Sequence, residues 1–244
     1  MPVAGWDFSW FGGRATEERP SWGYARLLSE RIGRADAVLD IQTGGGEVLA
    51  EAVRRSATDA GRPRRLAATE SWPPNVELAR RALEPLGAVV AKVDDDEPLP
   101  FPAGTFDLVV SRHPTVVLWP EIARVLTPGG TYLAQQIGAG TNRELTDFMM
   151  GPQPAGQSRN ADWAQAQAQA AGLRVVDLRE QALRVEFFDV AAVVHFLKKV
   201  LWTVPGFTVA GYAEPLARIH AHIQEHGSFV SHAQRLLVEA RKPS

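Results

Sequence analysis

Short apolar runs alternate along the chain with segments whose apolar residues recur at helical spacing. Between the first two runs, Val48, Leu49, Ala52 and Val53 repeat as on one face of a helix, which Gly61 would end. The alternation of strands and helices predicts a parallel sheet with helices on both faces. The predicted strands are residues 38–41, 64–70, 88–93, 106–111, 131–136 and 173–178, with a last strand within 229–239.

The boundaries of the other helices follow from proline, glycine and capping residues. Two prolines at 73 and 74 begin a helix that runs to Leu83, and the helix before the fifth strand ends at residues 128–130. Asn160 caps an alanine-rich helix to about residue 171. Two more helices, at 189–200 and 215–225, lie in an insertion before the last strand.

Three glycines at positions 44–46 follow the first apolar run, after Gln42 and Thr43. They let a ligand approach the backbone closely, and Glu70, which ends the second strand, is placed to bind a ribose diol. The dinucleotide fingerprint fails at Leu49, and no Lys-Ser/Thr pair completes a P-loop. Glu47, in the first helical turn, would repel a phosphate. The pattern therefore indicates a nucleoside site without phosphate, which S-adenosylmethionine fits.

Four stretches in this order resemble the class I S-adenosylmethionine-dependent methyltransferases, in particular the group that acts on small molecules. They are residues 38–47, 67–72, 95–111 and 121–130, and the resemblance spans about 38–136. It implies a doubly wound, seven-stranded, mostly parallel Rossmann-like sheet with one antiparallel strand at the end. The family usually has glycine where this chain has Gln42, which would alter the turn near the methionine end of the cofactor.

The resemblance also implies which residues bind the cofactor. Glu70 would accept hydrogen bonds from both ribose hydroxyls, Asp95 would meet the adenine amino group, and Asp40 would reach the cofactor's amino group. Each has a plainer interpretation, as a solvated strand-end acid, an acidic turn or a strand-end cap. The complete predicted set is Asp40, Thr43, Gly44, Gly46, Glu70, Ser71, Trp72, Asp95, Asp96 and Ser111, with Trp72 either stacking on adenine or covering the sheet edge.

A catalytic residue is harder to identify from the sequence, because in-line methyl transfer from a sulfonium depends mainly on alignment of the reactants. His113, just beyond the fourth strand, is the candidate general base, and a structural histidine is an equal alternative. Arg112, His195 and Trp202 are candidates for the substrate side. His222 and His226 share a helical face, but without a third ligand they indicate no metal site.

The composition limits the classes of chemistry and of binding partner that the chain can have. The chain has 244 residues, a net charge of −2, no cysteine and no long basic run, which excludes thiol chemistry and disfavours a nucleic-acid substrate. No apolar run approaches the length of a membrane span and the first residues resemble no signal peptide, so we expect a cytoplasmic monomer or homodimer.

A single domain covering residues 1–244 is expected, with three functional segments. Residues 1–34, rich in aromatics, would form a lid; residues 35–140 would bind the cofactor; and residues 181–228 would form a helical roof over the substrate. The predicted function is methyl transfer from S-adenosylmethionine to an O, N or C atom of a small molecule. Two alternatives stay open: an RNA base methyltransferase, and a module of this fold that binds the cofactor without transferring its methyl group.

Overall fold

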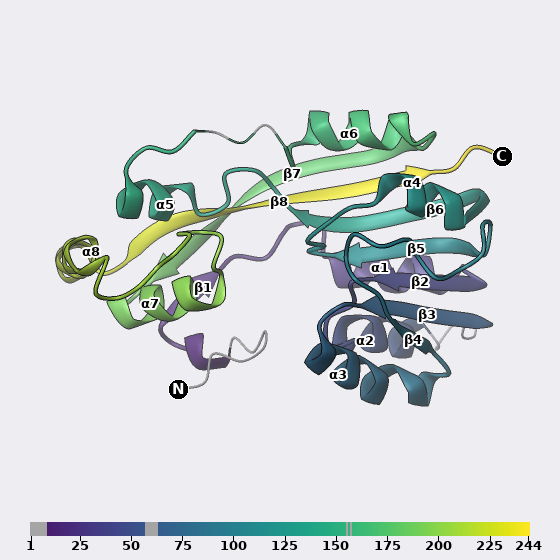
Figure 1. The fold of residues 1–244 in the computed structure, drawn as a ribbon, viewed down its shortest axis with the longest axis horizontal. Coiled ribbons are helices and arrows are strands. Elements are labelled where there is room, and N and C mark those ends of the chain that lie inside the picture. The colour runs from purple at the N-terminus through teal and green to yellow at the C-terminus, as the bar shows by residue number, and fades with distance from the viewer. Residues whose placement is uncertain (1–8, 57–62, 155, 157) are drawn as a thin grey trace. The chain divides into compact units, whose positions relative to one another are not determined.

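A computed structural model describes residues 9–56, 63–154, 156 and 158–244, which form two compact units. The first unit comprises the described residues within 1–20, 138–157 and 181–235, and the second comprises those within 21–137, 158–180 and 236–244. Strands β7 (Arg174–Phe187) and β8 (Phe229–Arg241) each have a part in both units (Figure 1). Within the described residues, no helix is long and apolar enough to cross a membrane.

The second unit contains a mixed sheet in the order β7-β8-β6-β5-β2-β3-β4. Strands β4, β3, β2, β5 and β6 pair in parallel, and backbone hydrogen bonds join Gly129 and Gly130 of β6 to Lys242 just beyond the antiparallel β8. This is the Rossmann-like methyltransferase arrangement that the sequence predicted. The five parallel strands are β2 (Ala37–Ile41), β3 (Arg65–Glu70), β4 (Val89–Lys92), β5 (Phe106–Arg112) and β6 (Leu126–Ile137).

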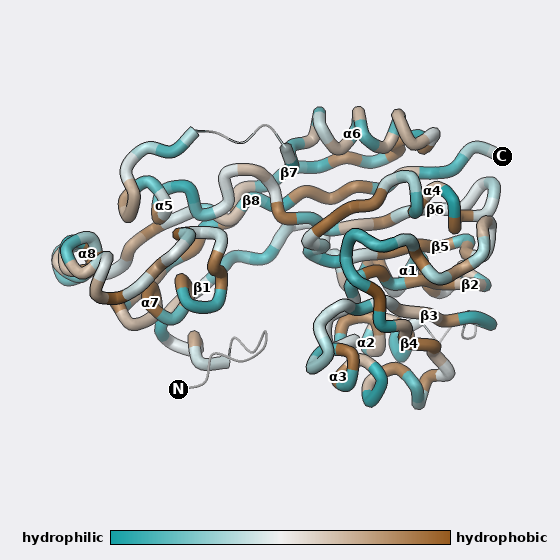
Figure 2. Tube along the Cα trace, in the orientation of Figure 1, coloured by the Kyte–Doolittle hydropathy of each residue, from teal (hydrophilic) through white to brown (hydrophobic). Residues whose placement is uncertain are grey.

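Helices cover both faces of this sheet because its inner strands are apolar on both sides. Val38 and Val110 point into one buried cluster, whereas their neighbours Leu39 and Val109 point into the other. The first cluster lies under α1 (Tyr24–Ile32), α2 (Glu47–Ser56) and α3 (Pro73–Leu83), and the second under α4 (Trp119–Val125) and α6 (Ala161–Ala170). Helices α2 and α3 carry both hydrophobic and hydrophilic positions, as one buried face requires (Figure 2).

The first unit has its own apolar core, built from Leu145, Val193, Ile219 and their neighbours. Its strand β1 pairs antiparallel with the end of β7, with Ala15 opposite Phe187. The elements that belong wholly to this unit are η1 (Ser9–Phe11), β1 (Ala15–Glu17), α5 (Arg143–Met150), α7 (Val190–Lys199) and α8 (Ala213–His226).

Several predicted boundaries need correction. The helix before the fifth strand ends at Val125, and residues 126–130 already belong to β6, because Gly129 and Gly130 pair with Lys242, a partner far away in sequence. Strand β1 adds an eighth strand to the seven predicted. The helix end expected at Gly61 lies outside the described residues.

The segments expected to cover the substrate also differ from the prediction. Residues 181–187 continue β7 instead of beginning a helical roof, since Leu183, Val185 and Phe187 alternate with exposed or half-buried neighbours at the period of a strand. In the expected lid, Trp22 and Tyr24 are buried in the core of the second unit, together with Leu28 of α1. For these two aromatics the packing interpretation is therefore favoured. Trp6 and Phe8 lie outside the described residues.

Candidate functional site

The glycine turn joins β2 to α2 at the carboxyl edge of the sheet, where open α/β sheets bind ligands. Gly44 and Gly46 have φ of 66° and 78°, a region that strains residues with a Cβ. The Thr43 amide donates to the Thr69 carbonyl at 2.9 Å, so the turn rests on β3. The turn is thereby fixed before any ligand arrives.

Glu70, at the end of β3, is buried and holds three backbone amides. Its Oε2 accepts from Gly44 at 2.8 Å, and its Oε1 accepts from Ser71 and Trp72 at 3.1 and 3.0 Å. Burial raises the pKa of Glu70, and these hydrogen bonds oppose that rise. The carboxylate thus joins the glycine turn to the start of α3, with Trp72 half-exposed beside it.

Asp40, the second-to-last residue of strand β2, carries a second buried carboxyl group. Burial is the main cause that raises its pKa to about 7; the hydrogen bond from Thr43 Oγ1 at 2.6 Å opposes the rise, and the charges of Glu47 and Glu70 add to it. A buried acid whose proton is poised near neutral pH is typical of a site that receives a cation or exchanges a proton.

Asp95 follows β4 and accepts a hydrogen bond from the Thr115 hydroxyl. Its neighbour Asp96 is exposed. Downstream, Arg124 donates to the carbonyls of Leu99 and Phe101 at 2.9 and 2.7 Å, which fixes the end of the acidic stretch against α4. Asp40, Glu70 and Asp95 therefore stand at the ends of three neighbouring strands.

A cleft opens beside these acids, between the ends of β2, β3 and β5. Its walls combine apolar side chains such as Val93, Leu99 and Val117 with the polar groups of Asp95 and Ser111. Apolar walls with a few polar groups are the usual composition of small-molecule sites. The full lining is Ile41, Gln42, Thr69, Val93, Asp94, Asp95, Glu97, Leu99, Ser111, Pro114, Val116, Val117, Leu118, Ile122 and Tyr132.

Ser111 and His113 lie at the end of β5. Ser111 is buried; its hydroxyl pairs with the Tyr132 hydroxyl at 2.8 Å, and its carbonyl accepts from Tyr24 at 3.0 Å. His113 has a left-handed φ of 56°, and its amide donates to the Gln135 carbonyl at 2.7 Å. Arg112, between them, is exposed.

Contacts with Gln135 define the tautomer of His113. The Trp22 indole can only donate, so the amide atom it meets at 2.9 Å is Gln135 Oε1. The Gln135 NH₂ therefore faces His113 Nε2, also at 2.9 Å, and Nε2 must accept. The imidazole is then neutral with its proton on Nδ1, and action as a base through Nε2 would require Gln135 to release it.

Gln42 occupies the position where the resembled family has glycine. Its φ of 57° lies in the left-handed region, which costs a residue with a side chain roughly 1–2 kcal/mol. The side chain leaves the turn toward the loop after β5, where it bonds Thr115 and Val116. No local sequence signal pairs these residues, which are more than seventy positions apart.

The two remaining predicted substrate residues belong to the first unit. His195 of α7 stacks on Trp10 with ring centroids 4.4 Å apart and meets Phe11 edge-on at 5.2 Å; burial, followed by the charges of Lys199 and Lys198, lowers its pKa. Trp202 is 53% exposed in the loop after α7.

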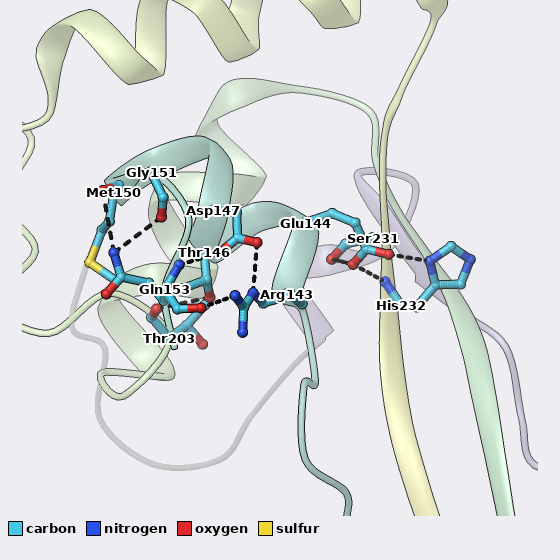
Figure 3. Close-up of polar contacts among 10 residues, drawn as sticks. All are labelled: Arg143, Glu144, Thr146, Asp147, Met150, Gly151, Gln153, Thr203, Ser231 and His232. Atoms are coloured by element: carbon cyan, nitrogen blue, oxygen red, sulfur yellow. Dashed lines mark hydrogen bonds and ion pairs between the residues drawn. The ribbon is translucent and has the colours of Figure 1, made fainter. Parts of the chain in front are cut away.

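A polar cluster in the first unit had no sequence signal. Glu144 of α5 accepts from Ser231 Oγ and the His232 amide at 3.0 and 3.1 Å, and pairs with His232 Nδ1 at 2.7 Å (Figure 3). Burial raises the pKa of Glu144, but these hydrogen bonds outweigh it and lower the pKa overall. On the same helix Arg143 bonds Asp147 at 2.6 Å. The cluster fastens α5 to β8.

The structure thus brings most of the predicted cofactor residues together in the second unit and adds others. Residues that the sequence did not indicate are Thr115, Gln135 and Tyr132, each of which contacts a predicted residue through tertiary structure. Trp22, expected only as an aromatic of the lid, contacts Gln135 instead. A buried polar residue in a strand, as Gln135 is, was the one available hint.

The doubly wound sheet with a glycine turn and an acid after each of three neighbouring strands defines the class I S-adenosylmethionine-dependent methyltransferase fold. Residues 39–134 match the family model described as a methyltransferase domain. The chain therefore carries a methyltransferase domain over residues 39–134 and has the Rossmann-like methyltransferase fold.

Solved structures support the fold. The chain is similar to the YcgJ protein of Bacillus subtilis, with 17% identity, a TM-score of 0.62, and coverage of 91% of this chain and 98% of that one. It is also similar to an S-adenosylmethionine-dependent methyltransferase of Mesorhizobium loti, with 16% identity, a TM-score of 0.54, and coverage of 91% of this chain and 97% of that one. Similarity to the [4+2]-cyclase SpnF has 18% identity, a TM-score of 0.52, and coverage of 90% of this chain and 80% of that one. Among the curated proteins, none matches this sequence.

Proposed function

We propose that the protein transfers the methyl group of S-adenosylmethionine to a small-molecule acceptor and that the cofactor binds at the carboxyl edge of β2, β3 and β4. The observation that carries the proposal is the placement of Asp40, Glu70 and Asp95 at the ends of these neighbouring strands. When bound, the cofactor supplies an electrophilic methyl group on a cationic sulfur.

The donors present fit the groups of this cofactor. Three of the roughly four lone-pair sites of the Glu70 carboxylate hold backbone amides, so Oε2 keeps one site for a ribose hydroxyl, and the second hydroxyl would share an oxygen with an amide. Asp40 offers a buried acid to the cationic amino group, and Asp95 accepts from the adenine amino group beside apolar walls. The backbone that would line the site comes from Thr43, Gly44, Gly46 and Ser71. The ends of the site are bordered by Asp96, Trp72 and Ser111.

On the acceptor side, the chain orients rather than activates. Ser111 and His113 lie at the same sheet edge, and His113 presents an Nδ1–H donor in the tautomer fixed by Gln135. Arg112 offers an exposed cation for an anionic acceptor, and His195 and Trp202 stay candidates for the substrate side. In-line transfer then depends on alignment, and a base is needed only for an acceptor that must lose a proton.

The net charge of −2 favours a small molecule over RNA. The similarity to the [4+2]-cyclase SpnF keeps a second candidate in view, a reaction other than methyl transfer in the same fold. Because acceptor screening measures the product S-adenosylhomocysteine, it separates the two: turnover with small molecules supports our proposal, turnover with RNA alone contradicts it, and binding without product favours the second candidate.

Calorimetric titration with S-adenosylmethionine and S-adenosylhomocysteine tests the site itself. Glu70→Ala should weaken both affinities by about 100-fold, because a hydrogen bond from the ribose to a charged group, worth roughly 1.5–3 kcal/mol, is lost. Glu77→Ala, which removes an exposed acid on α3, should bind as the wild type does. Thermal unfolding of each variant confirms that it is folded. Absence of binding by the wild-type protein would contradict the proposal.

A further inference from the structure

We propose that Gln42 is a positioning residue that ties the glycine turn to the loop after β5, residues 113–117, and that Thr115 couples this tie to the adenine end of the site. The second half of this inference rests on the function proposed above, because it assigns Asp95 to the adenine amino group. The first half concerns contacts within the protein alone.

The tie consists of three hydrogen bonds from one side chain. Gln42 Oε1 accepts from the Thr115 amide at 2.6 Å and from the Thr115 hydroxyl at 2.9 Å, and Gln42 Nε2 donates to the Val116 carbonyl at 2.8 Å. All hydrogen-bonding atoms of the amide except one proton are therefore directed at the loop. The backbone N–H of Gln42 donates to Thr69 Oγ1 at 3.2 Å, which also joins Gln42 to β3.

The backbone of Gln42 supports a dedicated role for this side chain. A φ of 57° favours glycine, and a side chain persists there only where its contacts compensate for the strain. The only contacts that the described structure shows for the Gln42 side-chain amide are those with Thr115 and Val116. We infer that the strained residue is kept for the tie.

The loop that receives the tie is also held from its other side. Arg159, just before α6, donates to the Thr115 carbonyl at 2.7 Å. At the start of the loop, His113 is bound through its backbone and its ring to Gln135. Pro114 and Val116 line the cleft beside Asp95. Fixing Thr115 therefore fixes both a wall of the cleft and the position of His113.

The Thr115 hydroxyl is the point of coupling. A hydroxyl has one proton to donate, yet both Gln42 Oε1 and Asp95 Oδ2 lie within bonding distance of it. When the adenine amino group takes the place of the Thr115 hydroxyl at Asp95 Oδ2, the Thr115 proton becomes available to Gln42 alone. Occupation of the adenine end would then strengthen the tie and hold the loop, including His113, in place for the acceptor.

Hydrogen exchange of the amide at position 115 tests the tie without any cofactor. Gln42→Gly relieves the strained φ but removes the tie, and Gln42→Asn tolerates the same φ with a side chain one methylene too short to reach. Both should speed exchange at position 115 by about tenfold, the effect of one lost hydrogen bond, while the amide of Thr43 stays protected by Thr69. Unchanged exchange at position 115 in both variants would overturn the proposal.

The coupling is tested by adding S-adenosylhomocysteine. At saturating ligand, the amide at position 115 should exchange several-fold more slowly in the wild type than it does without ligand; Thr115→Val should bind the ligand but lose this slowing, and Thr115→Ser should restore it. Equal slowing in Thr115→Val and the wild type would overturn the coupling. If the wild type binds no ligand, the proposed function fails, and the ligand-free experiment still decides the tie.

Discussion

At the scale of single residues, the buried Asp40 makes cofactor binding depend on pH. Its pKa of about 7 lies above the 3.8 of an unfolded chain, so the folded state binds the extra proton between these values. Folding stability due to this group is therefore highest at low pH and falls as pH rises from about 4 to about 7. Cofactor binding should follow the opposite trend, because a cationic amino group prefers the ionised carboxylate.

We expect the affinity for S-adenosylhomocysteine to fall by up to about tenfold for each pH unit below 7, since binding must displace one proton from Asp40. Above pH 7 the affinity should level off. Asp40→Asn should bind more weakly at pH 8 and lose the dependence. Titration calorimetry from pH 5.5 to 8.5 in two buffers of different ionisation enthalpy measures both affinity and proton release; a flat wild-type profile would contradict this expectation.

The sequence indicated residues that stand next to strand ends and missed those that reach them through tertiary contacts. Glu70 could be placed because it ends its own predicted strand, and Asp95 because it stands in a motif of the resembled family. Trp22 and Gln135 are 113 positions apart, and their hydrogen bond follows from how α1 packs on the sheet. Gln42 was recognised as a departure from glycine, but its partner Thr115 was not predictable.

At the scale of elements, the start of α2 and the end of α3 approach closely at Gly46. A Cβ on Gly46 would lie 2.9 Å from Leu83 Cγ and 3.2 Å from Ala79 Cα, and the residue has φ of 78°. At Gly44 the φ is 66°, yet a Cβ would meet nothing within 4 Å. A side chain at Gly44 would therefore meet backbone strain alone, whereas one at Gly46 would meet both backbone strain and a steric clash with α3.

Gly46→Ala should lower the free energy of unfolding by roughly 2–4 kcal/mol, from left-handed strain together with overpacking against α3. Gly44→Ala, the matched control, should cost only the strain of about 1–2 kcal/mol. Urea unfolding followed by circular dichroism measures both. Equal losses in the two variants would show that the approach of the helices does not require glycine.

Strands and helices with local signals were predicted closely, whereas boundaries set by distant partners were not. Asn160 caps α6 as expected, its Oδ1 accepting from Trp163 at 2.8 Å. The Pro-Gly-Gly sequence at 128–130 is typical of a turn, but residues 126–130 belong to β6 because Gly129 and Gly130 pair with Lys242. A local pattern cannot reveal a partner more than a hundred residues away.

At the scale of the whole molecule, each of the two units has its own apolar core, so the cofactor can stabilise one unit more than the other. A ligand that binds only the folded second unit stabilises it by about 2.7 kcal/mol at one hundred times its Kd. Hydrogen exchange of the full chain with and without S-adenosylhomocysteine should therefore show slower exchange at residues 40–47 and 66–72, which hold the proposed site.

The same measurement decides the role predicted for residues 181–228. If this segment forms a roof over the substrate, as its sequence suggested, the amides of α7 and α8 should also exchange several-fold more slowly when ligand is bound, because water would be excluded from that side. Glu70→Ala at the same ligand concentration is the control, and it should abolish both effects together. Slowing confined to the second unit would contradict the roof and leave recognition of the acceptor to Arg112, His113 and the loop held by Gln42.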